Sequence, residues 1–107
     1  MGKEIKSGLD EKRSKIMSAS IQRGVDIYLA ENIDKFGYGH VTFVEISGDL
    51  KSAWVYVNFE DKERSDESLM TLNGSRREVS NIIKELIKTR YFPKVNFQKG
   101  EDEDLVI

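Results

Sequence analysis

The stretch 44–59 constrains the fold of this chain more than any other part of the sequence. Its second half alternates without a break between apolar residues on one side of an extended chain and aromatic or polar residues on the other. Strict alternation of β-branched and aromatic residues is typical of a strand with one buried face. The apolar side consists of Ala53, Val55, Val57 and Phe59, and the opposite side consists of Trp54, Tyr56 and Asn58.

A turn separates this strand from a shorter apolar segment that precedes it. Ser47-Gly48-Asp49 has turn chemistry, because Gly accepts a positive φ and because Ser and Asp side chains bond to nearby backbone amides. We therefore predict an antiparallel hairpin with strands at about 41–47 and 52–59. The apolar face of this hairpin has to be covered by helices from the rest of the chain.

A long helix is predicted before the hairpin. It runs from Lys12 to about Ile33 and follows Asp10, which is a suitable N-cap residue. Gly24 lies on the inward face of this helix and suggests a close approach of its backbone to the sheet, with a merely tolerated glycine as the alternative. Met17 is predicted to fill the core.

The helical region after the hairpin is interrupted. Ser65 is predicted to cap a short helix that contains Met70 as a second core residue, and Asn73-Gly74-Ser75 breaks this helix. Helical periodicity then resumes and ends before Pro93, and residues 94–98 alternate as a third strand. The apolar stripe of the resumed helix consists of Val79, Ile82, Ile83, Leu86 and Ile87.

The predicted order is helix, strand, strand, helix, kink, helix, strand. This order gives a single α+β domain in which helices cover one face of a three-stranded sheet. We predict a flexible N-terminal lead-in at 1–10, the folded domain at 11–98 and an acidic, mostly disordered C-terminal tail at 99–107. The four consecutive acids at 101–104 outweigh the formal net charge of −2, so residues 1–100 are net positive.

The composition excludes several kinds of site. The 107-residue chain has no Cys, which excludes disulfides and thiolate metal sites, and it has a single His, which excludes a multi-histidine metal centre. No apolar run approaches the roughly 20 residues of a membrane helix, and the N-terminus lacks the apolar segment of a signal peptide. We therefore expect a cytoplasmic protein with no membrane contact, no metal site and no cofactor.

Two arrangements that resemble catalytic or phosphate-binding motifs are better explained as loops. Gly37-Tyr38-Gly39 lacks the Lys-Ser/Thr pair and the following helix of a P-loop. Ser47, Asp49 and His40 have the residue types of a catalytic triad, but two of them belong to the predicted turn. The sequence contains no other nucleophile–base pair and no paired carboxylates in an apolar context, so we expect no enzymatic activity.

Two motifs carry a family resemblance. The first is the pattern Val-Glu-Ile-Ser-x-Asp-Leu-x-x-Ala-x-Val-Tyr-Val-x-Phe over 44–59, and the second is an Arg, two residues, a Pro and the last strand with its Phe, over 90–97. In these motifs the chain resembles the bacterial ribosome-binding factor A family over about residues 11–98. The resemblance implies a type-II KH-like fold, binding to 16S rRNA, and a role in maturation of the 30S subunit that includes rRNA processing and cold adaptation.

The chain departs from this family at the kink between the two later helices. Where family members have Ala-x-Gly, the aligned positions here are Ser75-Arg76-Arg77, with Gly74 just upstream. Ser80 replaces an Arg that the family usually carries one turn later. We therefore expect a kink that is shifted along the chain and more basic.

Contact with rRNA requires cations spaced along the phosphates, and helix N-termini also favour anions. Cations at the start of the last helix and along its face meet this requirement, and cations of the first helix would extend the surface if the two helices pack side by side. An ordinary solvated helix face is the alternative. The predicted RNA-binding residues are Lys12, Arg13, Lys15, Arg23, Arg76, Arg77, Lys84, Lys88 and Arg90.

The expected partners are 16S rRNA and the immature 30S subunit, bound by a monomer. Trp54 and Tyr56 face away from the predicted core, where aromatic residues either stack on bases or pack against a neighbouring strand. The alternative function is therefore a KH-like module that acts mainly through protein–protein contacts on the Trp54/Tyr56 sheet face.

Overall fold

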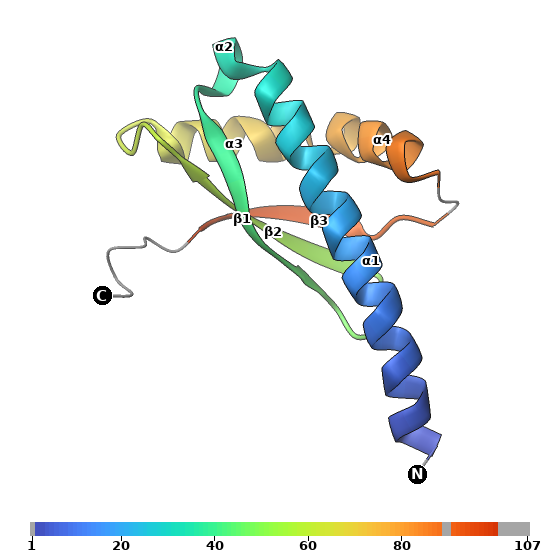
Figure 1. Cartoon of the computed structure of the whole chain (residues 1–107). Coiled ribbons are helices and arrows are strands. Elements are labelled where there is room, and N and C mark those ends of the chain that lie inside the picture. The colour runs from blue at the N-terminus through green and yellow to red at the C-terminus, as the bar shows by residue number, and fades with distance from the viewer. Residues whose placement is uncertain (1, 89–90, 101–107) are drawn as a thin grey trace.

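Three strands form one sheet in the order β1-β2-β3, with β2 in the centre (Figure 1). β1 and β2 are antiparallel, whereas β2 and β3 are parallel and are joined by a crossover of two helices. The computed structural model describes residues 2–88 and 91–100, with side chains from Lys12 onward except that of Ile87. The strands are β1 (Gly39–Ile46), β2 (Ser52–Phe59) and β3 (Lys94–Lys99).

Helices cover one face of this sheet, and none of the described helices lies on the other face. Figure 1 shows α1, α3 and α4 on the same side, with α1 against β1, α3 against β2 and β3, and α4 against β3 and α1. This arrangement confirms the predicted α+β architecture and the predicted hairpin. The helices are α1 (Gly2–Glu31), α2 (Ile33–Phe36), α3 (Ser65–Gly74) and α4 (Arg76–Ile87).

The inward row of β2 forms the centre of the core. Ala53, Val55 and Val57 are at most 1% exposed, and the outward residues between them are only half-buried. Complete burial of a Val or Leu side chain contributes about 1.5–3 kcal/mol, so this row is a main source of stability. Its most deeply buried partners are Ile21, Val25 and Leu29 of α1, Leu72 of α3, Val79 and Ile83 of α4, and Phe97 of β3.

Side chains close the hairpin turn. The Ser47 hydroxyl donates to Asp49 Oδ1 (2.7 Å), and the amide of Lys51 donates to the same oxygen (3.0 Å). The amide of Ser52 donates to Ser47 Oγ (3.0 Å). The left-handed conformation belongs to Leu50 (φ 63°) and not to Gly48, because the side-chain hydrogen bonds on both sides of Leu50 fix the backbone there.

Both edges of the sheet are capped by helix side chains. On the β1 edge, the amide of Val41 donates to Asp26 Oδ1 of α1 (2.9 Å). On the β3 edge, the amide of Phe97 donates to Asn73 Oδ1 (3.0 Å), and Asn73 Nδ2 donates to the carbonyl of Phe97 (3.1 Å). Asn73 thus replaces the backbone of a missing neighbouring strand, which protects an edge that would otherwise pair with other chains.

The break between α3 and α4 is held on two sides. Asn73 attaches it to β3, and Ser75 hydrogen-bonds the hydroxyl of Tyr28 on α1. Burial and then the negative charge of Glu78 raise the pKa of Tyr28, while the Ser75 hydrogen bond acts in the opposite direction. The predicted kink at Asn73-Gly74-Ser75 is therefore correct, and it is an anchored junction.

Two predicted helix caps are wrong. α1 begins at Gly2, so Asp10 lies within the helix, because Lys3, Glu4, Lys6 and Leu9 favour a helix and no proline interrupts the segment. Ser65 is the first residue of α3 and donates its hydroxyl to the carbonyl of Lys62 (3.0 Å), so it does not cap the helix. α1 also ends earlier than predicted, at Glu31, and the single turn α2 follows it.

The two methionines that were predicted to fill the core differ in their burial. Met17 packs against the core as predicted, but the prediction for Met70 is wrong, because this side chain is 76% exposed. Leu72, two positions later, takes the buried place on α3. Residues 101–107 of the predicted tail, which include its four consecutive acids, lie outside the described residues. Within 2–88 and 91–100, no helix is both long enough and apolar enough to cross a membrane.

Replacement of Asn73 by Ala should destabilise the domain by about 1–3 kcal/mol, because the amide and carbonyl of Phe97 lose their partners. The melting temperature should fall by roughly 4–8 °C per kcal/mol. Urea denaturation followed by circular dichroism measures this change. Asn81→Ala, at an exposed position of α4, is the matched control, and an equal effect of both substitutions would contradict the edge-capping role of Asn73.

The turn carboxylate should titrate below the ordinary Asp value of about 3.9. The hydrogen bond from Ser47 and then the amide of Lys51 lower the pKa of Asp49. Because the folded-state pKa is lowered, the stability that this turn contributes is present at neutral pH and is lost as the pH falls through that pKa. An NMR titration of the Lys51 amide measures the midpoint, and Ser47→Ala should raise it. An unchanged midpoint in that variant would contradict this assignment.

Candidate nucleic-acid interface

α1 and α4 lie side by side because Gly24 allows their backbones to approach. A Cβ atom at Gly24 would lie 2.7 Å from Cγ1 and 3.2 Å from Cγ2 of Ile83, which is completely buried. The close approach that the sequence suggested for Gly24 is therefore present, but its partner is α4 and not the sheet. This contact places the cations of two helices, far apart in sequence, on neighbouring surfaces.

A groove of two adjoining hollows runs along the outside of the α1–α4 contact, and Ser20 lines both. The first hollow, of about 580 Å³, lies between the middle of α1 and the end of α4. The second, of about 410 Å³, lies where the chain leaves α4. The first is lined by Ala19, Ser20, Arg23, Gly24, Ile27 and Leu86, and the second by Arg13, Ile16, Met17, Ser20, Leu50, Lys88 and Tyr91.

The charged residues among the described lining of this groove are all cations. Arg13, Arg23 and Lys88 line it and are exposed, and no acidic residue is among the described residues that line either hollow. Lys88 reaches this position because it ends α4 in the left-handed conformation (φ 48°, ψ 51°). We call Arg13, Arg23 and Lys88 the groove cations. Their arrangement around a concave surface suits an anionic ligand.

An exposed apolar stripe beside these cations was not predicted. Ile16 is 61% exposed, Leu86 is 51% exposed and Ile27 is 39% exposed. Leu86 was predicted to lie in the core, but it borders the groove. The signal was present in the sequence, since Ile16 and Ile27 share one side of α1, nearly opposite Val25, but its meaning depends on where α4 lies.

Arg76 is separated from the groove cations. Its Nη1 donates to Asn96 Oδ1 on β3 (3.2 Å), which places its guanidinium at the edge of the sheet. At 3.6 residues per turn, Arg77 and Lys84 fall on the flank of α4 opposite Leu86, and therefore away from α1.

The remaining predicted cations are distributed on both sides of α1. Lys12 lies on the same side of α1 as Arg23, three turns earlier, whereas Lys15 lies opposite Gly24 and points away from α4. Both are exposed. Arg90 lies outside the described residues. The structure thus brings together the groove cations and Lys12, and it separates Lys15, Arg76, Arg77 and Lys84 from them.

The arrangements that suggested catalysis do not form a site. Ser47 and Asp49 are bonded to each other within the turn, while His40 lies at the opposite end of β1. Gly37 has a positive φ (74°) at the end of α2, and a strand, not a helix, follows it. No group of three or more His, Cys, Asp or Glu residues suited to a metal ion occurs in the part of the chain that the structure describes.

Comparison with known proteins identifies related sequences. The protein-family model of ribosome-binding factor A matches residues 13–105. The ribosome-binding factor A of Natranaerobius thermophilus is 30% identical over 97 residues, which are 90% of this chain and 70% of the relative. Both matches extend over most of the chain, and they include the hairpin and the α1–α4 pair.

Solved structures have the same fold. The crystal structure of ribosome-binding factor A from Thermus thermophilus superposes with a TM-score of 0.69 at 20% identity, over 80% of this chain and 94% of that one. A Thermus thermophilus homology model, fitted into a cryo-electron microscopy map of a complex of 30S with this factor, gives 0.64 at 21% identity, over 77% and 89% of the chains. The predicted KH-like fold is therefore confirmed.

The effect of Gly24→Ala on the free energy of unfolding should depend on the side chain at position 83. In the wild type the added methyl group meets Cγ1 of Ile83, and overpacking of about 1–3 kcal/mol outweighs the roughly 1 kcal/mol gain in helix propensity. In an Ile83→Ala background the obstructing atoms are absent, so the same substitution should be neutral or stabilising. A double-mutant cycle of unfolding free energies measures this coupling, and equal effects in both backgrounds would contradict the close contact.

Proposed function

Because this chain belongs to the ribosome-binding factor A family, we propose that it binds the immature 30S subunit through 16S rRNA and assists the maturation of that subunit. The observation that carries the proposal is the α1–α4 groove, where three cations and no described acid line a concave surface. The related Thermus thermophilus factor has been fitted into a 30S complex, which supports the same partner here. We further propose that the chain acts as a monomer in the cytoplasm and contributes to rRNA processing and to growth in the cold.

In this proposal the groove cations contact the rRNA phosphates. Arg groups bind phosphate through paired N–H donors, whereas Lys88 contributes a point charge. Lys12 extends the contact along α1. Arg77 and Lys84 on the outer flank of α4, Lys15 on α1 and Arg90 are secondary contacts. The chain acts by binding, without a catalytic step, because rRNA recognition needs only correctly spaced cations and amides.

Salt dependence tests the groove cations. Each phosphate contact contributes about 0.7–0.9 to the slope of log affinity against log salt, so Arg13→Ala/Arg23→Ala/Lys88→Ala should reduce the slope by roughly 2–3 units. Co-sedimentation with immature 30S subunits over a series of salt concentrations measures this slope. We expect the variant to bind weakly at low salt and to lose less affinity than the wild type as salt increases.

Two further triple variants make this experiment specific. Lys35→Ala/Lys62→Ala/Arg64→Ala removes the same charge from α2 and from the acidic segment before α3, and it should bind like the wild type. Arg76→Ala/Arg77→Ala/Lys84→Ala tests the cations that point away from the groove. If the groove variant changes 30S binding no more than the first control does, the assignment of the groove cations to the RNA-binding site is wrong. Absence of 30S binding by the wild type would contradict the proposed function. Binding that does not change with salt would favour the alternative function, in which the chain acts through protein–protein contacts.

A further inference from the structure

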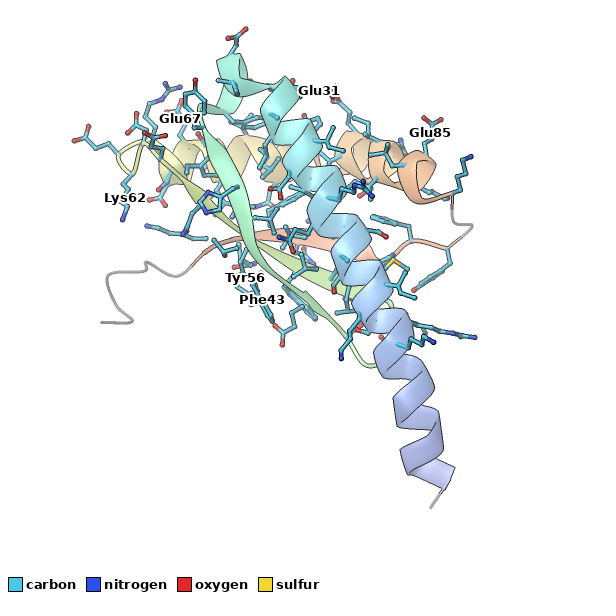
Figure 2. The ribbon with its side chains drawn as sticks, in the orientation of Figure 1. Glu31, Phe43, Tyr56, Lys62, Glu67 and Glu85 are labelled. Carbon is cyan, nitrogen blue, oxygen red and sulfur yellow. The ribbon has the colours of Figure 1, made fainter. Side chains whose placement is uncertain are left out.

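The face of the sheet opposite the helices carries an exposed aromatic cluster. Figure 2 shows Phe43 and Tyr56 side by side on this face, directed away from α1, α3 and α4. Their ring centroids are 5.9 Å apart and their planes are tilted by 37°. Phe43 is 58% exposed, which is unusual for a Phe in a strand, whereas Tyr56 and Trp54 are half-buried. We call Phe43, Tyr56 and Trp54 the aromatic face.

A β-bulge places Phe43 there. The register of β1 against β2 shifts between Val41 and Phe43, so that Thr42 and Phe43 are both exposed while Val41 and Val44 are buried. A bulge leaves one residue unpaired and locally disrupts the ladder. Regular alternation from Val41 would turn Phe43 toward the core, so the bulge directs an aromatic ring to the open face.

The spacing of the rings suits consecutive unstacked bases. Trp54 and Tyr56 are two residues apart on β2, so their positions are about 6.6–6.8 Å apart along the strand. This distance is about twice the 3.4 Å rise of stacked nucleotides, and it allows two adjacent bases of an extended strand to lie on separate rings. Phe43 lies directly across from Tyr56 in the register and enlarges the surface.

The two sides of the aromatic face differ in charge. On the β3 side, Arg76 is held by Asn96, which pairs with Trp54 in the register, and Lys94 lies on the same outward side of β3. On the β1 side, Glu45 pairs with Trp54 and accepts a hydrogen bond from the Tyr56 hydroxyl (3.4 Å). A phosphate backbone is therefore favoured along β3, whereas the carboxylate of Glu45 accepts base amino groups and repels phosphate.

We propose that the aromatic face binds unpaired nucleotides of single-stranded RNA, with bases on Phe43, Tyr56 and Trp54 and phosphates near Arg76 and Lys94. This inference rests on the proposed function, since it takes RNA as the ligand. The outward-facing strand residues that the structure describes include aromatic, amide, hydroxyl and charged side chains but none that is aliphatic. Rings surrounded by amides match stacking and hydrogen bonding to bases better than they match an apolar protein interface.

Trp54 is the only tryptophan of the chain, so its fluorescence reports directly on this face. We expect oligouridine and oligoadenosine of about 12 nucleotides to quench Trp54 emission in the full chain, because a stacked base contacts the indole ring. A duplex RNA of the same length should leave the emission unchanged, because its bases are already paired and stacked. Free N-acetyltryptophanamide corrects for absorption by the RNA.

Phe43→Leu distinguishes stacking from apolar contact, because it removes the aromatic ring and keeps an apolar side chain. We expect it to weaken binding of the single-stranded RNA by roughly 5- to 150-fold, the range for loss of one base–aromatic stack. Tyr38→Leu is the matched control, since it removes a ring that is 65% exposed in the loop before β1, and it should leave the affinity unchanged. Thermal unfolding verifies that both variants fold. If Phe43→Leu does not fold, the quenching of Trp54 in the wild type decides whether the aromatic face binds RNA.

The outcomes separate this inference from the proposed function. If the wild type binds immature 30S subunits but RNA does not quench Trp54, the aromatic face does not bind RNA, and the proposed function stands. If the wild type does not bind these subunits, the proposed function fails, and quenching by the oligonucleotides alone decides this inference. If Phe43→Asp abolishes subunit binding while RNA leaves Trp54 emission unchanged, the face is a protein-docking surface and the inference is overturned.

Discussion

Burial of the inward row of β2 beneath a single layer of helices is the constraint on which the rest of this structure depends. Three strands are few, so two of the three are edge strands, and the helix layer has to cover the apolar face and also the edges. Asp26 and Asn73 perform the second task, each from a helix that already packs on the core. Among residues 2–88 and 91–100, no helix covers the opposite face of the sheet (Figure 1).

The edge hydrogen bonds also determine where the candidate interface forms. Asn73 attaches the end of α3 to β3, and Ser75 attaches the start of α4 to Tyr28 of α1. From this anchored point α4 runs beside α1, and the Gly24–Ile83 contact fixes the distance between the two helices. The groove cations thus owe their proximity to polar contacts at the kink and to the absence of a side chain at Gly24.

The sequence was sufficient to predict the hairpin, the kink and the order of elements, because alternation and turn residues are local properties of the chain. It was insufficient for Met70, since two turns of helix carry too few apolar residues to identify the buried face. It identified which cations are candidates for RNA binding, but not which of them lie together in the folded chain. Arg76 and Arg77 are neighbours in sequence, yet only Arg76 reaches β3, because grouping depends on how α4 packs against α1 and the sheet. Leu50 takes the left-handed conformation expected of Gly48 because the hydrogen bonds of Ser47 and Asp49 outweigh the intrinsic preference.

The two proposed RNA surfaces lie on opposite sides of the sheet, and this separation restricts the ligand that can reach both. A stiff duplex seated in the α1–α4 groove cannot also place bases on Phe43 and Trp54, because the sheet lies between them. A flexible single strand can pass around the β3 edge, where Arg76 is held beside the open face by Asn96. Arg76, which the packing of α4 separates from the groove cations, would then contact the phosphates at the crossing between the two surfaces. Simultaneous use of both surfaces therefore requires rRNA that is unpaired close to the site, which is a property of a subunit that has not completed its folding.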